Sequence, residues 1–223
     1  MSGITIAIDG PASSGKGTVA RGVAQALGYA YIDTGAMYRA VALMSRRAGV
    51  ALADAVSVAA VADALDVRFV WEESLLRLFV GDEDVTRAIR QDQVSADASV
   101  VSAHPQVRAA LLDRQRALGA DGGVVMDGRD VGTVVLPGAH LKVFLDADLD
   151  ERARRRHEEL LRRGESVALA GVRAALAERD RADRERAVAP LRAADDAVHI
   201  DSTDLSIPEA IARVVRLARA RGA

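Results

Sequence analysis

The sequence predicts an α/β fold in which buried strands alternate with helices, and three observations support this class. A short apolar run at residues 4–9 leads into a glycine-rich stretch at 10–18, after which residues 19–27 repeat apolar side chains at helical spacing. Two later apolar runs, at 123–127 and 141–146, each end in an aspartate. With 223 residues, the chain is long enough for one large α/β domain or for a core with insertions.

Composition argues against several classes of protein. Hydrophobic residues make up 50% and charged residues 28%, which indicates a soluble globular chain. A net charge of −2 does not suit a general nucleic-acid coat, and the absence of cysteine rules out disulfides and thiolate metal sites. No apolar run reaches the roughly 18 to 20 residues of a membrane span, and the first residues lack the layout of a signal peptide. We therefore expect a cytoplasmic enzyme.

The glycine-rich stretch lies where a loop between a strand and a helix can bind phosphate. The backbone N–H groups of such a loop point inward, and the positive end of the helix dipole faces the anion. Lys16 would reach the outer phosphates, and the Thr18 hydroxyl would face Mg²⁺. The alternative is a turn without a ligand, which the flanking strand and helix disfavour. The predicted nucleotide-binding residues, hereafter the phosphate loop, are Gly10, Pro11, Ala12, Ser13, Ser14, Gly15, Lys16, Gly17 and Thr18.

One residue of the phosphate loop departs from the strict G-x4-G-K-[ST] pattern, because Gly17 stands between Lys16 and Thr18. The resulting G-K-G-T is similar to the loop of nucleoside monophosphate kinases, and it differs from that of most GTPases. A GTPase is also disfavoured because its guanine site uses an N-K-x-D element, and this sequence contains no asparagine.

The next elements continue the alternation. The first helix is expected to stop at Gly28, and a short strand at 29–32 follows. Residues 33–35 predict a loop and the start of a second helix, which ends at about residue 48. Arg39 lies in the first turns of that helix, where it would face a ligand above the sheet edge. The alternative is an ordinary exposed arginine.

A small antiparallel meander at about 67–86 interrupts this alternation. Two apolar runs, at 67–71 and 75–80, are separated by Glu72-Glu73-Ser74, and a second turn precedes Val85-Thr86. An insertion of this kind is often a lid or a substrate-binding subdomain. The alternative is a hairpin without a role in function.

An acid ends the strand that follows. Residues 87–119 first predict helices with a break near His104-Pro105, and the next strand then ends at Asp127. Open α/β sheets bind ligands at the carboxyl ends of their strands. Asp127 is therefore a candidate to hold Mg²⁺ through water, Arg129 to meet a phosphate, and Asp130 to contact a polar group of a substrate. The alternative is a polar turn.

A charge-rich helical segment comes next, with one helix from about Leu149 to Arg163 that Gly164 ends. Mixed charge of this kind is usually a solvated helical face, but it also suits a lid that closes over phosphates. Arg179, Asp183 and Arg186 are spaced i, i+4 and i+7, so they share one face of a helix. Two cations around one acid suit a phosphate and a sugar hydroxyl.

These features fit phosphoryl transfer between nucleotides. Such a kinase brings two polyanions together, so positioning and charge neutralisation supply most of the catalysis. Arg39, Arg129, Arg179 and Arg186 come from separate segments and would converge on the phosphates, which arginine binds through its planar fork. The alternatives are another small P-loop kinase, for UMP or for a small-molecule hydroxyl, and a nucleotide sensor without turnover.

Several motifs together resemble the bacterial cytidylate kinases. They are I-A-I-D-G-P-A-S-S-G-K-G-T at 6–18, D-T-G-A-M-Y-R at 33–39, D-G-R-D-V-G-T-V-V-L-P at 127–137, E-R-D-x-x-D-R-x-R-A-V-A-P-L at 178–191 and D-S-T-D-L-S at 201–206. The resemblance covers nearly the whole chain. The first motif is shared by many kinases, whereas D-G-R-D and R-A-V-A-P-L are much more particular to this family.

The resemblance implies a P-loop kinase fold, with a five-stranded parallel sheet flanked by helices, a small antiparallel insertion and a helical lid. It implies that ATP, with Mg²⁺, phosphorylates CMP and dCMP in pyrimidine nucleotide metabolism. We expect one kinase domain over residues 1–223, with nucleotides as partners, no nucleic acid, no membrane, and a monomeric state. Its parts are a core (about 1–66, 87–148 and 187–223), a nucleotide-acceptor insertion (about 67–86) and a lid (about 149–186).

The resemblance also assigns roles to individual residues. An acid that faces the exocyclic amine of cytosine would discriminate against a keto group at that position. Thr34 stands where the family usually has serine and keeps the hydroxyl. The implied sets are Ser99, Arg108 and Asp130 for cytosine; Arg39, Arg129 and Arg186 for the acceptor phosphate; Thr34, Arg179 and Asp183 on the sugar side; Lys16, Asp127, Arg129 and Arg186 for catalysis; and Thr18 and Asp127 (through water) for the metal.

Overall fold

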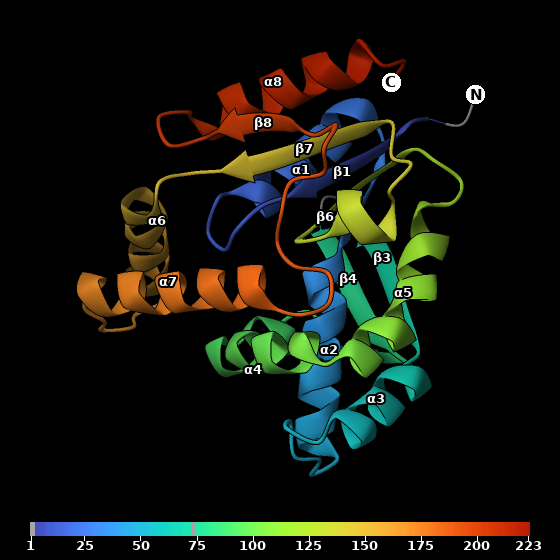
Figure 1. The fold of residues 1–223 in the computed structure, drawn as a ribbon, viewed down its shortest axis with the longest axis vertical. Helices are drawn as coiled ribbons and strands as arrows, with labels where there is room; N and C mark the ends of the chain where they lie inside the picture. The colour runs from blue at the N-terminus through green and yellow to red at the C-terminus, as the bar shows by residue number, and fades with distance from the viewer. Residues whose placement is uncertain (1–2, 73–74) are drawn as a thin grey trace. The chain divides into compact units, whose positions relative to one another are not determined.

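A computed structural model of the chain describes residues 3–72 and 75–223 (Figure 1). It contains two compact units, of which the first combines the chain up to Tyr31 with Asp121–Ala223 and the second comprises Ile32–Ala120. Within the described residues, no helix has the length and apolar character needed to cross a membrane.

A five-stranded sheet forms the centre of the first unit, in the order β2-β6-β1-β7-β8. The strands are β1 (Thr5–Asp9), β2 (Ala30–Asp33, which continues into the second unit), β6 (Val124–Gly128), β7 (Leu141–Asp146) and β8 (Val198–Asp201). β1 runs parallel to both β6 and β7, and β7 runs parallel to β8. The predicted parallel sheet is therefore confirmed, and its strands end together at one edge.

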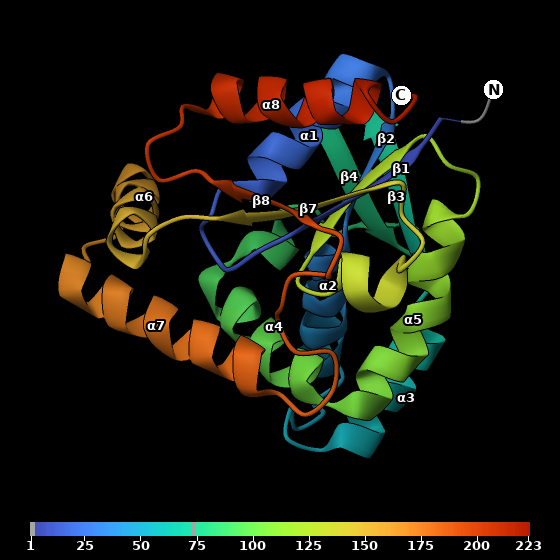
Figure 2. The ribbon, with the colours of Figure 1, turned by 45° about the horizontal axis from the view of Figure 1, so that its top comes forward.

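Helices cover this sheet, which explains the apolar character of its central strands. All residues of β1 are buried, as expected for a strand covered on both faces. Helices α1 (Lys16–Leu27) and α8 (Ile207–Arg219) pack against each other on one face (Figures 1 and 2). α1 stops at Gly28 with a φ of 68°, as the sequence predicted, and Ser206 and Glu209 form a capping box at the start of α8.

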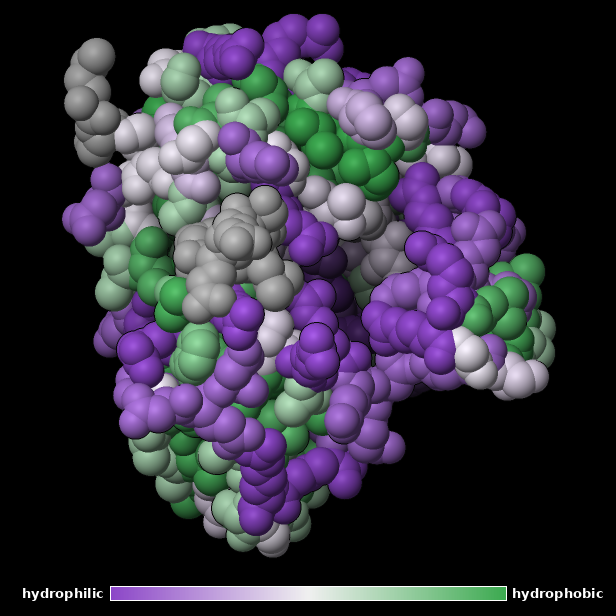
Figure 3. Space-filling view, turned by 180° about the vertical axis from the view of Figure 1, so that it is seen from behind, coloured by the Kyte–Doolittle hydropathy of each residue, from purple (hydrophilic) through white to green (hydrophobic). Residues whose placement is uncertain are grey.

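Helices α6 (Leu149–Arg162) and α7 (Leu169–Glu185) form a pair that begins after β7 (Figure 1). Its core is small and apolar, and one member comes from the phosphate loop. Buried in this cluster are Ala12, Ala153, Leu160, Val172 and Leu176. Figure 3 shows a largely hydrophilic surface over the pair, with hydrophobic surface at its far end. Exposed ion pairs, such as Arg154 with Glu151, account for much of the charge that the sequence placed here.

The second unit packs four helices around a small sheet. The helices are α2 (Thr34–Arg47), α3 (Ala55–Ala64), α4 (Asp92–Ala103) and α5 (Pro105–Gly119), with a 3₁₀ turn at Ala88–Arg90; the antiparallel strands are β3 (Val67–Glu72), β4 (Leu75–Val80) and β5 (Glu83–Asp84). Their apolar side chains, among them Met37, Val41, Leu78 and Leu111, form a single buried cluster. The helix break at His104-Pro105 is as predicted, with Pro105 opening α5.

Two local predictions differ from the structure, and one local element was not predicted. The third strand of the meander is Glu83–Asp84 and excludes Val85-Thr86, because the Thr86 hydroxyl accepts the Leu78 N–H at 2.9 Å in place of a strand partner. No loop separates β2 from α2, since the Asp33 carboxylate caps the helix by accepting the Ala36 N–H at 3.0 Å. A π-helical turn at Val131–Val135 was not predicted. The predicted turn at Glu73-Ser74 lies outside the described residues.

Candidate active site

The phosphate loop joins β1 to α1, so its backbone N–H groups and the start of the helix meet at the carboxyl edge of the sheet. Gly15 has a φ of 86° and directly precedes the helix. The Lys16 side chain is only 8% exposed, and its ammonium donates to the Pro11 carbonyl at 3.0 Å. The lysine therefore lies folded over its own loop, where a charged ligand would meet it.

Neighbouring elements fix the backbone of this loop. Arg152 of α6 donates to the Ala12 carbonyl at 3.2 Å and forms an ion pair with Asp180 of α7 at 2.7 Å. The Ser202 hydroxyl, in the loop after β8, donates to the Ser14 carbonyl at 3.1 Å. Because these bonds hold carbonyl groups, they restrain the loop without using the N–H groups that would bind an anion.

Asp127 is the penultimate residue of β6 and lies beside the phosphate loop. It is buried, and the Tyr31 hydroxyl donates to its Oδ1 at 2.8 Å. A side chain at Gly17 would come within 3.4 Å of the Tyr31 hydroxyl and 3.8 Å of Asp127 Oδ2. The first turn of α1 therefore passes close to this carboxylate, with room for a Cβ at Gly17. Thr18, in the same turn, is exposed.

An alternating network of arginines and acids lies in the first unit. Arg129 donates to Asp183 at 2.9 Å, while Arg186 lies 4.0 Å from Asp183 and 3.5 Å from Asp130. Burial raises the pKa of Asp183, but the charges of Arg129 and Arg179 outweigh it and hold the pKa below its usual value. The structure therefore brings these five predicted residues together, although Arg186 is extended and follows the last residue of α7.

The remaining predicted residues belong to the second unit. Thr34 is buried at the first position of α2, and Arg39 forms an ion pair with Asp33 at 2.6 Å, so it is not an ordinary exposed arginine. Burial raises the pKa of Asp33, but the charge and hydrogen bond of Arg39 outweigh it, and the pKa falls.

Two predicted residues of α4 and α5 are linked through a third. Arg108 is buried, with its guanidinium 5.3 Å from the centre of the Tyr38 ring, and it donates to the Ser102 carbonyl at 3.3 Å. The Ser102 hydroxyl in turn donates to the Ser99 carbonyl at 3.1 Å. Arg108 and Ser99 are thus connected through Ser102 within this unit.

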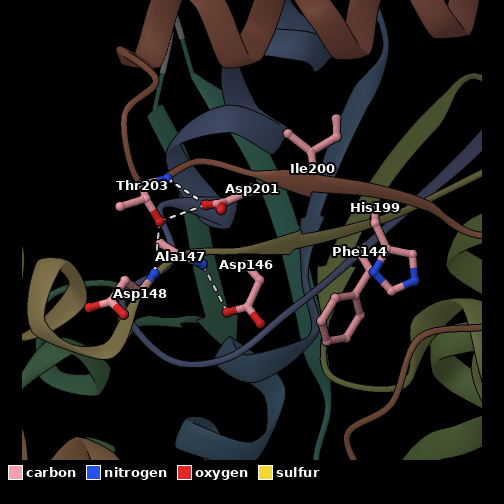
Figure 4. Close-up of a pocket in the computed structure, with 8 residues that line it drawn as sticks. All are labelled: Phe144, Asp146, Ala147, Asp148, His199, Ile200, Asp201 and Thr203. Carbon is pink, nitrogen blue, oxygen red and sulfur yellow. Dashed lines mark hydrogen bonds between the residues drawn. The ribbon is translucent and has the colours of Figure 1, made fainter.

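A pocket of about 320 Å³ lies at the carboxyl ends of β7 and β8, and Figure 4 shows its lining. The Asp148 N–H donates to the Thr203 hydroxyl at 2.9 Å, and that hydroxyl donates to Asp201 at 2.6 Å. Ser202, between two lining residues, also bonds the phosphate loop. None of the predicted site residues lines the pocket, which is formed by Phe144, Asp146, Ala147, Asp148, His199, Ile200, Asp201 and Thr203.

Sequence reasoning missed several residues that shape the site. Tyr31 lies in a predicted strand and Asp33 in the predicted loop after it, but neither was given a role in the site, and Arg152 lies in a segment with many arginines. Asp9 had a usable signal, because it ends the apolar run at 4–9 in the same way that Asp127 ends the apolar run at 123–127.

Comparisons with known proteins agree with one another. The family model described as "Cytidylate kinase" matches residues 6–220. The chain is 48% identical to a "Cytidylate kinase" of Exiguobacterium sibiricum over 98% of both chains. It is 47% identical to one of a Geobacter species, over 98% of this chain and 94% of that one, and 48% identical to one of Streptococcus gordonii over 98% of both. A crystal structure of an uncharacterised Eubacterium ventriosum protein shares the fold, with a TM-score of 0.52 and 12% identity over 97% of this chain and 98% of that one.

Proposed function

Because this chain belongs to the cytidylate kinase family, we propose that it transfers the terminal phosphoryl group of ATP directly to CMP and dCMP, forming CDP and dCDP in pyrimidine nucleotide metabolism. The observation that carries the proposal is the network of Arg129, Asp183, Arg186 and Asp130, in the same unit as the phosphate loop. A phosphate-binding loop alone does not select the acceptor. This network offers paired arginines to a second phosphate and a carboxylate to a nucleobase.

The proposed reaction needs positioning and charge neutralisation more than proton chemistry. The acceptor phosphate oxygen attacks the terminal phosphorus of ATP, and the bond to the leaving oxygen of ADP breaks in line with it. Lys16 would exchange the Pro11 carbonyl for phosphate oxygens of ATP. Arg129 and Arg186 would bind the acceptor phosphate, helped by Arg39, and would neutralise charge as it moves between the nucleotides.

Specificity for the acceptor nucleotide is proposed to come from two further sets of residues, one for the base and one for the sugar. Ser99, Arg108 and Asp130 would recognise cytosine, because a carboxylate accepts from its exocyclic amine and repels a keto oxygen. Thr34, Arg179 and Asp183 would contact the sugar. We propose that residues 149–186 act as a lid that excludes water, that 67–86 serve acceptor binding, and that the rest forms the core of one monomeric domain.

The residues around Asp127 fit a magnesium ion. Magnesium prefers oxygen ligands and commonly uses one or two carboxylates together with substrate phosphates. Asp127 offers a buried, oriented carboxylate, and Thr18 offers an exposed hydroxyl on the adjoining turn of α1. Among the described residues, no group of three or more acidic, histidine or cysteine side chains could hold a metal. When bound, the ion would neutralise charge on the ATP phosphates.

The first test is a coupled assay of ADP formation with ATP and, in turn, CMP, dCMP, UMP, AMP and shikimate. We expect rapid turnover with CMP and dCMP only. Absence of turnover with both would refute the proposal. Binding of ATP without ADP formation from any acceptor would instead identify a nucleotide sensor.

Asp130→Ala is expected to weaken CMP binding more than ATP binding. Losing a buried polar contact costs about 1 to 3 kcal/mol, so the KM for CMP should rise roughly 5- to 150-fold. The ratio of kcat/KM for CMP over UMP should fall, because the carboxylate no longer distinguishes amine from keto oxygen. Asp113→Ala, at an exposed acid of α5, is the control. An unchanged KM for CMP would contradict the role of Asp130 in recognising cytosine.

Tyr31→Phe is expected to raise the Mg²⁺ concentration needed for half-maximal activity by about tenfold, the lower end of the range for residues that orient metal ligands. The variant keeps the ring but removes the donor to Asp127 Oδ1. Tyr29→Phe is the matched control, since its hydroxyl accepts the Ile4 N–H at 3.1 Å instead. Equal Mg²⁺ requirements in both variants would show that Tyr31 does not orient Asp127.

A further inference from the structure

The carboxylate of Asp9 is buried at the end of β1, and the proposed reaction gives it no part. Asp9 is only 4% exposed. Oδ1 accepts the Val131 N–H at 2.8 Å, and Oδ2 accepts the Gly132 N–H at 2.7 Å. Both oxygens are thus engaged by the backbone of a segment more than a hundred residues away in sequence.

The placement of Asp9 connects two parts of the site. Gly10, the first residue of the phosphate loop, follows it directly. On the other side, Val131 and Gly132 come immediately after Arg129 and Asp130 and begin the π-helical turn. Asp9 also lies beside Gly128 in the pairing of β1 with β6. One side chain therefore joins the segment that would bind the donor to the segment that would bind the acceptor.

Burial of the Asp9 carboxylate penalises its charged form. Burial raises the pKa of Asp9 to about 7, although the two backbone N–H groups lower it. The nearby charges oppose each other, since Asp130 raises the pKa and Lys16 lowers it. A neutral side chain would avoid this cost, but an asparagine has only one oxygen and would turn its amide toward the other N–H group.

We propose that Asp9 is a positioning residue, which holds Arg129 and Asp130 in the place where the acceptor meets the phosphate loop. This inference rests on the proposed kinase function. The phosphate loop has other restraints, from Arg152 and Ser202. Loss of the Asp9 hydrogen bonds therefore frees the 129–132 segment more than the phosphate loop. The reaction with the acceptor nucleotide should suffer more than the binding of ATP.

The test is Asp9→Asn, measured by kinetics with CMP, by calorimetric binding of ATP and by amide hydrogen exchange over residues 129–135. We expect kcat/KM for CMP to fall about 10- to 100-fold, since displacement of a catalytic group by about 1 Å costs on that order. The Kd for ATP should change less than about twofold, and the Val131 and Gly132 amides should exchange faster. Equal losses for CMP and ATP, or unchanged exchange, would overturn the inference.

Asp54→Asn is the matched control. Asp54 also accepts two backbone N–H groups, those of Val56 and Ser57, but it caps α3 in the second unit. Its variant should keep wild-type kinetics with both nucleotides. If it shows the same loss for CMP as Asp9→Asn, the effect is general and the inference fails.

A double-mutant cycle separates positioning from a merely structural role. If Asp9 acts through the 129–132 segment, the fold-loss in kcat/KM for CMP caused by Asp9→Asn should be at least about threefold smaller in an Arg129→Ala background than in the wild type. Fully additive losses would overturn the inference. Gly132→Ala disturbs the same bond from the other side, because its Cβ would lie 3.3 Å from Asp9 Oδ2, and it should give a smaller effect of the same kind should Asp9→Asn not fold.

Failure of the inference is distinguishable from failure of the proposed function. A wild-type protein that does not phosphorylate CMP or dCMP refutes the function. Wild-type turnover together with unaltered CMP kinetics in a folded Asp9→Asn variant overturns the positioning role alone.

Discussion

Lys16→Ala should lower kcat by about a thousandfold, a loss in the range seen when one preorganised charge stabilising a transition state is removed. Lys16 is 8% exposed, and its ammonium already lies over the phosphate loop, where it donates to the Pro11 carbonyl. A phosphate oxygen carries more negative charge than that carbonyl, so ATP should take its place as the partner. Steady-state kinetics with saturating ATP and CMP measure the loss, and circular dichroism checks the fold.

The chain offers a matched control for this variant, because its sequence contains only one other lysine, Lys142. The Lys142 ammonium pairs with exposed Asp196 at 2.9 Å. Lys142→Gln removes a charge but keeps the γ-methylene that lies beside Gly132. It should retain near-normal kcat. A Lys16→Ala enzyme with near-normal kcat would remove Lys16 from the catalytic residues.

Asp180→Ala should lower the free energy of unfolding by about 3 to 5 kcal/mol, as expected when one partner of a buried ion pair is lost. The side chains of Arg152 and Asp180 are 5% and 4% exposed. Without the carboxylate, the Arg152 charge remains buried against the carbonyl groups of Ala12 and Ala147. Urea denaturation, monitored by circular dichroism, measures the change.

Two further variants test this explanation. Arg154→Ala removes an arginine of the same helix whose ion pairs are exposed, and it should leave the unfolding transition nearly unchanged. The double variant Arg152→Met with Asp180→Leu should recover much of the lost stability, because it leaves no unpaired charge. If Asp180→Ala proves as mild as Arg154→Ala, the buried pair is not what holds α6 to α7.

The sequence was sufficient where a local rule decides the structure. Gly28 ends α1 because only a residue free to adopt positive φ stops a helix in this way, and the apolar runs of β1 and β6 require cover on both faces. The grouping of Arg129 with Asp183 was also accessible, since helical spacing and the position of Asp127 directed attention to both segments. Arg186 joins this group from the extended residue after α7, so the helical face predicted for it was wrong.

The rest depends on contacts between distant segments. Nothing near Thr86 in the sequence indicates that its hydroxyl accepts the Leu78 N–H and so moves β5 by two residues. Arg152 could not be separated from its many neighbouring arginines, because only its burial against Asp180 distinguishes it. For the same reason the hydrogen-bond partners of Asp9 and Tyr31, which lie 122 and 96 residues away, were not predicted, although the strands that hold the two residues were.

The burial of Ala12 among Ala153, Leu160, Val172 and Leu176 means that the phosphate loop is not a self-contained cassette. The backbone conformation of the loop depends on its own residues, but the Ala12 side chain belongs to the core of α6 and α7, more than 130 residues later in the chain. A designer who transplants residues 10–18 to another scaffold would leave Ala12 without these neighbours. Conversely, a change to the small apolar core of α6 and α7 also reaches the phosphate loop, through the contacts of Ala12.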